Sequence, residues 1–149
     1  QMVDSESLRQ MGLPSKEGLT VHIQSFSYHR GIPRDASGHG GGFVFDCRIL
    51  PNPGRLPEYA HLTGKDAAVI IYLEQNDTVK SFGNDINHMI DQAVTHHLQR
   101  GFSDLSINFG CTGGQHRSVF FAEKARKYVI DKYDVTVDLK HRELERGEY

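Results

Sequence analysis

The sequence contains no tryptophan, only two cysteines and no long uninterrupted run of apolar residues. Two cysteines are too few for the disulfide framework of a small secreted protein, and without a long apolar run we expect no membrane span. Neither charge dominates, because 17 basic and 19 acidic residues leave a net charge of −2. No overall positive field would therefore draw the chain onto nucleic acid or a membrane. We expect a globular, cytoplasmic protein.

The length of 149 residues suits a single domain whose core needs neither a disulfide nor a metal ion. Nine histidines are present, but their spacing shows no repeated ligand pattern, so we expect no metal site and no cofactor. Residues 1–18 are polar, include Pro14 and do not begin with methionine. We interpret them as a linker or a remnant of cloning, and residues 19–149 as the domain.

Periodicity predicts an α/β fold. Alternating apolar and polar residues indicate strands at 19–27, 43–48, 104–109 and 135–139. Apolar residues at intervals of three and four indicate a helix that is capped by Thr78 or Asp77 and ends before Gly101, and further helices are expected at 66–76 and 115–130. Strands separated by helices favour a mainly parallel sheet flanked by helices, with ligands bound beyond the carboxyl ends of the strands.

The segment 110–118, Gly-Cys-Thr-Gly-Gly-Gln-His-Arg-Ser, joins the predicted strand at 104–109 to the helix that follows. Such a turn leaves backbone N–H groups unpaired at the start of a helix, where the helix dipole adds positive potential. We expect Gly113 and Gly114 to bend the chain with positive φ, and Arg117 to offer a fork of donors to phosphate oxygens. A purely structural turn is the alternative, but it would not require this collection of reactive and charged residue types. The segment predicts a site for phosphate or a similar anion.

Polar side chains also follow the other predicted strands. The pair 29–30 (His-Arg) follows the first strand, Asp46 and Arg48 lie late in the second with Asn52 just beyond, and the pair 141–142 (His-Arg) follows the last. Each group has a simpler explanation, since Asp46 and Arg48 could pair with each other and the basic C-terminal residues could be a solvated tail. We expect them to converge on one edge of the sheet.

The spacing between Cys111 and Arg117, followed by Ser118, matches the Cys-x5-Arg-Ser/Thr loop of cysteine-dependent phosphatases. In that chemistry the loop binds phosphate and lowers the thiol pKa, so that the thiolate attacks phosphorus. A general acid would also be required, and Asp35 or Asp46 could be nominated. A thiol phosphatase is therefore the alternative hypothesis.

Five ordered motifs give a longer match. They lie at residues 28–33 (YHRGIP), 45–53 (FDCRILPNP), 62–66 (LTGKD), 110–119 (GCTGGQHRSV) and 140–145 (KHRELE). Together these motifs, which cover about residues 20 to 146, resemble the C-terminal domain of the RapZ family, the RNase adapter proteins.

The resemblance implies a binding module similar to a phosphofructokinase subdomain. In that family the domain senses an amino-sugar phosphate such as glucosamine-6-phosphate, binds small regulatory RNAs and forms oligomers. The implied ligand-binding residues are His29, Asp46, Arg48, Asn52, Thr112, Gly113, Gly114, His116, Arg117 and Ser118. The candidates for RNA contact are Lys140, His141 and Arg142. No catalytic residue is implied, and Cys111 becomes a small, partly buried residue of the turn.

The chain departs from the family in three respects. Family members carry an N-terminal nucleotide-binding domain with a P-loop, and this chain has no Gly-x4-Gly-Lys-Ser/Thr run, so ATP binding does not carry over. Gln115 stands where the family commonly has lysine. Finally, Glu143, Glu145 and Glu148 dilute the basic residues of the C-terminal segment, which should weaken RNA binding at cellular salt. We expect a regulatory domain that binds a phosphorylated metabolite, with RNA as a weaker partner.

Overall fold

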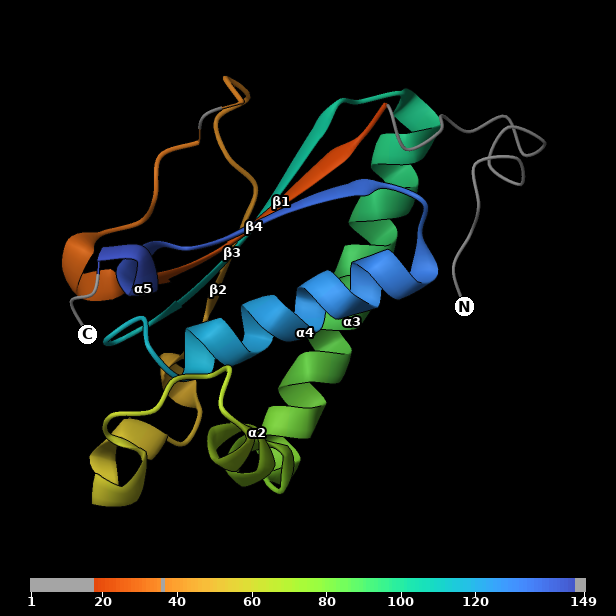
Figure 1. Ribbon diagram of the computed structural model, residues 1–149. Coiled ribbons are helices and arrows are strands. Elements are labelled where there is room, and N and C mark those ends of the chain that lie inside the picture. Colours follow the sequence, from red (N-terminus) through yellow and green to blue (C-terminus); the bar gives the residue numbers. More distant parts are fainter. Residues whose placement is uncertain (1–17, 36, 147–149) are drawn as a thin grey trace.

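The computed structural model describes residues 18–35 and 37–146, and Figure 1 shows how they are arranged. Within these residues the strands are β1 (Thr20–Ser27), β2 (Phe43–Asp46), β3 (Asp104–Cys111) and β4 (Thr136–His141). The α-helices are α2 (Ala67–Glu74), α3 (Asp77–Arg100), α4 (Arg117–Lys132) and α5 (Arg142–Arg146). Short 3-10 helices lie at Tyr28–Arg30, Cys47–Ile49, Pro53–Arg55 and Pro57–Tyr59. The predicted linker at residues 1–18 lies outside the described residues, apart from Gly18, and so does Glu148.

The strands form one sheet in the order β2-β3-β1-β4, and every pairing within it is parallel. Ser27 of β1 lies beside Cys111 of β3, and Asp46 of β2 lies beside Gly110. The predicted α/β fold is confirmed, and the sheet, expected to be mainly parallel, is parallel throughout the described residues. Because the strands run in the same direction, their carboxyl ends share one edge of the sheet.

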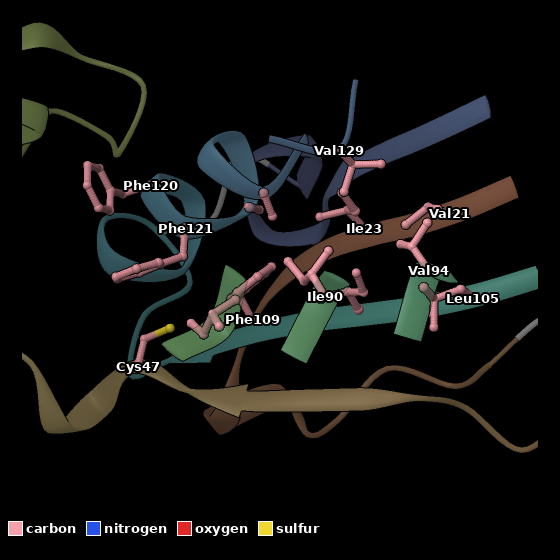
Figure 2. Close-up of a cluster of buried hydrophobic side chains, with 14 of the residues drawn as sticks. Val21, Ile23, Cys47, Ile90, Val94, Leu105, Phe109, Phe120, Phe121 and Val129 are labelled. Carbon is pink, nitrogen blue, oxygen red and sulfur yellow. The ribbon is translucent and has the colours of Figure 1, made fainter. Parts of the chain in front are cut away.

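One face of the sheet packs against α3 and α4. Val21 and Ile23 of β1 are buried there with Ile90 and Val94 of α3 and Val129 of α4, as Figure 2 shows. Burial of an aliphatic side chain of this size stabilises the fold by roughly 1.5–3 kcal/mol. This layer fixes the sheet, and with it the strand ends that carry the polar residues.

The opposite face of the sheet carries polar side chains at alternating positions of β1, β3 and β4. They are His22, Gln24, Ser106, Asn108, Asp138 and Lys140. In the described part of the chain no helix lies over this face, which is approached instead by the segment that connects β1 to β2 (orange in Figure 1). Such exposure is unusual, because parallel sheets are ordinarily covered on both faces.

The ends of α3 follow from local capping. The side chain of Asn76 accepts a hydrogen bond from the N–H of Val79 at 3.0 Å, and Gly101 ends the helix in the left-handed region at φ +69°. The predicted helix is confirmed, but the predicted cap, Thr78 or Asp77, is wrong by one or two residues. No helix among the described residues is long and apolar enough to cross a bilayer.

Candidate functional site

The carboxyl ends of the strands bring the predicted polar residues to one edge. Gly110 lies beside Asp46, Cys111 beside Ser27, and Ser25 beside His141. The expected convergence of strand ends is therefore confirmed, with the segment 110–118 at its centre.

The glycines of this turn have different roles. A Cβ on Gly110 would overlap the rings of Phe26 and Tyr28, so the residue is glycine for close packing. Gly114 has φ +70°, and a Cβ there would overlap the side chain of Glu143. Gly113 is exposed and does not have the positive φ that we expected of it, and a Cβ added there would meet open space. Gly113 is thus the position where a ligand could approach the backbone.

The turn presents unpaired donors. Among the described residues, no protein acceptor pairs with the backbone N–H groups of Gly113, Gly114, Gln115 or His116. His116 is the N-cap of α4, and its side chain makes no capping hydrogen bond. The N–H of Ser118, in contrast, is directed to the Cys111 sulfur at 3.4 Å. Consecutive free N–H groups before a 16-residue helix are the arrangement that binds anions at helix N-termini.

Arg117 is buried, with 4 % of its surface exposed. Its Nη1 donates to the carbonyl oxygens of Arg48 at 3.1 Å and Leu50 at 2.9 Å, and its Nη2 donates to Thr112 Oγ1 at 3.4 Å. The Nε atom is buried without a hydrogen-bond partner in the described structure. The guanidinium therefore ties residues 48–50 to the turn and adds positive charge behind it, rather than presenting the open fork that the sequence predicted.

The side chains of Gln115 and His116 also hold a distant segment. Gln115 Nε2 donates to the carbonyl oxygens of Ala60 at 2.9 Å and Leu62 at 2.7 Å, and His116 Nε2 lies 2.8 Å from that of Tyr59. Burial lowers the pKa of His116, so the neutral ring donates this bond. Both side chains are buried and engaged with the 59–62 segment.

Asp46 and Arg48 pair with each other on one side of the turn. Arg48 donates from Nε to Oδ1 of Asp46 at 2.8 Å and from Nη2 to Oδ2 at 2.7 Å. This hydrogen bonding holds the pKa of Asp46 below its usual range. The Arg48 guanidinium also lies 3.7 Å from the centre of the Tyr28 ring. The pairing weighed as a simpler explanation is therefore present, at the edge where Arg48 could still meet a ligand.

Two further predicted residues lie at the same edge. Asn52 is half-buried, and its side chain accepts the N–H of Gly54 at 3.0 Å to cap a 3-10 helix. Gly54 in turn approaches the ring of His116. His29 is exposed after β1, where its N–H is bound by Ser27 Oγ at 3.1 Å.

Sequence reasoning missed Glu143, which it placed in a diluting acidic tail. The carboxylate is fully buried beneath Gly114, and its Oε2 accepts the N–H of Ser27 at 2.8 Å. Arg142 donates to the same oxygen from Nε at 2.9 Å, and Arg30 lies 3.3 Å from Oε1. Two arginines are thus held beside the turn by one buried carboxylate. The sequence signal was an acidic residue two positions after the last strand, within the motif at 140–145.

The candidates for RNA contact are divided. Lys140 is exposed, whereas Arg142 is largely covered and donates to the carbonyl oxygens of Ser27 and Gly31. His141 is buried between Ser25 Oγ at 2.7 Å and Glu123 Oε2 at 2.6 Å. The position of His141 does not favour contact with a nucleic acid.

Cys111 is buried at the end of β3. Its thiol lies 3.1 Å from the hydroxyl of Ser118, and 2 % of its surface is exposed. The other cysteine, Cys47, is fully buried, and burial raises the pKa of its thiol. The turn therefore exposes Thr112 and Gly113 and keeps its sulfur buried.

Comparison with known proteins places this geometry in a family. Residues 19–145 match the family model described as the RapZ C-terminal domain. Proteins named "Nucleotide-binding protein" from Acidobacterium capsulatum, Fervidobacterium nodosum and Thermotoga neapolitana are 37 %, 38 % and 38 % identical over 87 %, 89 % and 95 % of this chain. The chain spans 40 %, 45 % and 48 % of their respective lengths, which is less than half of each. The match to the family model covers most of the sequence, and the chain belongs to the family of RapZ C-terminal domains.

Proposed function

We propose that this domain binds a phosphorylated small molecule at the turn 110–118, and that the ligand is an amino-sugar phosphate such as glucosamine-6-phosphate. The observation that carries the proposal is the run of unpaired N–H groups from Gly113 to His116 directly before α4. A phosphate there would accept several backbone hydrogen bonds and interact favourably with the helix dipole. The choice of an amino sugar rests on the family.

The charges around the turn support an anionic ligand. The Arg117 guanidinium lies behind Thr112, and Arg30 and Arg142 lie beside Gly114 with one carboxylate between them. These groups add positive potential where the N–H groups are unpaired, so a phosphate would be held by charge-assisted hydrogen bonds. A net charge of −2 over the whole chain does not oppose this, because the positive charge is local.

We expect binding without hydrolysis. The Cys111 thiol is covered and lies within hydrogen-bond distance of Ser118, which suits a packing role better than attack on phosphorus. The wild-type protein should therefore not hydrolyse a generic aryl phosphate at mildly acidic pH, and Cys111→Ser should keep its affinity for glucosamine-6-phosphate. Hydrolysis that disappears in Cys111→Ser would instead establish the thiol phosphatase.

Calorimetric titration with glucosamine-6-phosphate tests the site. In Gly113→Ala the added methyl group meets no protein atom within 4 Å, so the fold should survive while the ligand loses its approach. We expect affinity to fall about tenfold or more, which corresponds to roughly 1.4 kcal/mol. The control is Gly83→Ala in α3, outside the turn, which should bind as the wild type does. Equal affinity in Gly113→Ala and the wild type would contradict the proposal.

A second pair of variants tests Arg117. Arg117→Ala should abolish the thermal stabilisation that glucosamine-6-phosphate gives the wild type, because both the charge and the link to residues 48–50 are lost. Arg117→Lys keeps the charge and should retain part of the shift. ATP serves as a comparison ligand because the relatives are named nucleotide-binding proteins. A larger shift with ATP than with the sugar phosphate would replace the proposed ligand by a nucleotide.

We further propose that the domain is the sensing part of a longer regulator. The chain spans less than half of its relatives, which leaves room in them for another domain. RNA binding and assembly into oligomers are expected from the family. Light scattering of the chain in solution tests the second expectation, and a monomer at high concentration would contradict it.

A further inference from the structure

A cavity of about 570 Å³ lies on the helix-free face of the sheet. Its floor is formed by side chains of β1, β3 and β4, and its roof by the segment between β1 and β2. None of the residues 110–118 lines it, and of the residues described beside the turn only Arg142 borders it. Its volume is within the range of ordinary small-molecule sites.

The roof is fixed in place by Asp35. Its carboxylate accepts hydrogen bonds from the hydroxyl of Ser37 at 2.6 Å, from the N–H groups of His39 at 3.2 Å and Gly41 at 2.9 Å, and from Ser106 Oγ on the floor at 3.3 Å. These bonds, led by that from Ser37, hold the pKa of Asp35 far below its usual range. Of these bonds, the one from Ser106 joins the segment to the sheet.

The other carboxylates of the cavity are also engaged. Asp104 Oδ1 lies 2.7 Å from His22 Nε2, and Asp138 Oδ2 lies 3.4 Å from His22 Nδ1. Partial burial lowers the pKa of His22, but its bonds to the two aspartates outweigh this, and the pKa is raised. Asp104 and Asp138 are thus both engaged by His22.

Several other polar groups of the cavity have no comparable partner. Asn108 is 9 % exposed and donates from Nδ2 to the carbonyl oxygen of Phe43 at 3.1 Å, but no donor in the described structure reaches its Oδ1. The Gln24 carboxamide and the Arg34 guanidinium likewise have no hydrogen bond to the described part of the chain. Lys140 Nζ has only Glu145, at 3.7 Å. The groups that remain for a ligand are two carboxamides and two cations.

We propose that this cavity binds a small anionic metabolite, distinct from the ligand of the turn. A carboxylate or phosphate group of the metabolite lies against Lys140 and Arg34, where charge-assisted hydrogen bonds are available. Its polar groups meet the carboxamides of Gln24 and Asn108, and its apolar part lies against Ile32 and Val44, both of which are exposed in the cavity wall. The domain thereby responds to a second chemical signal.

Nitrogen-15 NMR titration with two probes, citrate and inorganic phosphate, tests the proposal. The side-chain NH₂ signals of Gln24 and Asn108 should shift saturably with at least one probe, and the stronger probe identifies the anionic group. Lys140→Ala should weaken this binding about tenfold. Lys65→Ala, which removes an exposed lysine that does not line the cavity, should leave it unchanged.

Calorimetry reports on the turn, and the NMR signals of Gln24 and Asn108 report on the cavity. Failure of one proposal can therefore be distinguished from failure of the other. In Gly113→Ala the response of Gln24 and Asn108 should persist even if the turn no longer binds phosphate. Absence of a saturable shift at Gln24 and Asn108 with both probes would overturn the proposal. It would also be overturned if Lys140→Ala bound as tightly as the wild type.

Discussion

At the scale of single residues, Asp46 competes with any incoming anion for Arg48. The two side chains form a bidentate pair with donor–acceptor distances of 2.8 and 2.7 Å. Asp46 also caps the 3-10 helix at Cys47–Ile49 by accepting the N–H of Arg48. Asparagine can keep the cap, because its side-chain oxygen accepts the same bond, while it removes the charge.

Asp46→Asn should therefore bind inorganic phosphate more tightly than the wild type, by a few-fold, since Arg48 is released. Glucosamine-6-phosphate should gain less, because the amino group of the sugar loses a nearby carboxylate. Parallel calorimetric titrations with the two ligands measure both effects. Weaker binding of inorganic phosphate by the variant would show that Arg48 takes no part in holding the anion.

Burial of His116 has a consequence for stability against pH. Because burial lowers its pKa, unfolded His116 takes up a proton at a higher pH than folded His116. The contribution of the neutral ring to stability is fully present above the unfolded pKa of about 6.5 and is lost as the pH falls from that value through the lower pKa of the folded state. His22, whose pKa is raised, contributes in the opposite sense: its stabilisation is present below about pH 6.5 and lost as the pH rises.

Urea unfolding just above and just below pH ~6.5 separates these two contributions. The free energy of unfolding of His116→Gln should fall less on acidification than that of the wild type. The free energy of unfolding of His22→Gln should fall more than that of the wild type, because this variant lacks the side chain that stabilises the fold at low pH. Identical pH profiles for the wild type and His116→Gln would mean that residue 116 is not buried as a neutral ring.

At the scale of elements, α3 contains a glycine that the fold does not need. Gly83 lies inside the helix, and a Cβ there would be 3.5 Å from the Phe121 ring, an ordinary contact. Gly83→Ala should raise the free energy of unfolding by about 0.5–1 kcal/mol, because alanine loses less backbone entropy in a helix. Urea unfolding measures the gain. Gly114→Ala is the matched contrast: φ is +70° and the methyl group would overlap Glu143, so it should destabilise.

Elements with a strong local pattern could be predicted from the sequence. The alternation in β1 and the spacing of apolar residues in α3 depend on neighbours in the chain, and both elements form where expected. The start of α4 depends on distant partners. The sequence predicted a helix from residue 115, but Gln115 and His116 turn to residues 59–62 instead, and α4 begins at Arg117.

The same reason limits prediction of the site. The glycine-rich turn and its place at the strand ends could be read from residue types, because both follow from the strand–turn–helix order. The burial of Glu143 could not, because its partner Ser27 is 116 residues away. Nor could the engagement of Arg117 by the carbonyl oxygens of Arg48 and Leu50, which a sequence pattern does not reveal.

At the scale of the whole molecule, the near-neutral net charge predicts different salt dependences for binding RNA and for binding a sugar phosphate. A net charge of −2 gives no long-range attraction to RNA, so any RNA contact depends on a few local cations. A small phosphate ester releases far fewer counterions than an RNA does when it binds. Affinity for glucosamine-6-phosphate should therefore change little between low and cellular salt, while affinity for a structured RNA should drop steeply.

Filter binding of a structured RNA at two salt concentrations, beside calorimetry of the sugar phosphate under the same conditions, measures this difference. Lys140→Ala should reduce RNA binding and flatten its salt dependence, because one phosphate contact is lost. Tight RNA binding that persists at cellular salt would contradict the proposal that the main ligand of this domain is a metabolite.

The contact between Glu143 and Ser27 joins the first strand to the last helix, so the turn rests on a residue that is translated near the end of this domain. A polypeptide still being synthesised has β1 and the glycines in place before it has this carboxylate beneath them. If the turn binds the proposed ligand, a nascent chain would lack the support of Glu143 until α5 has been synthesised.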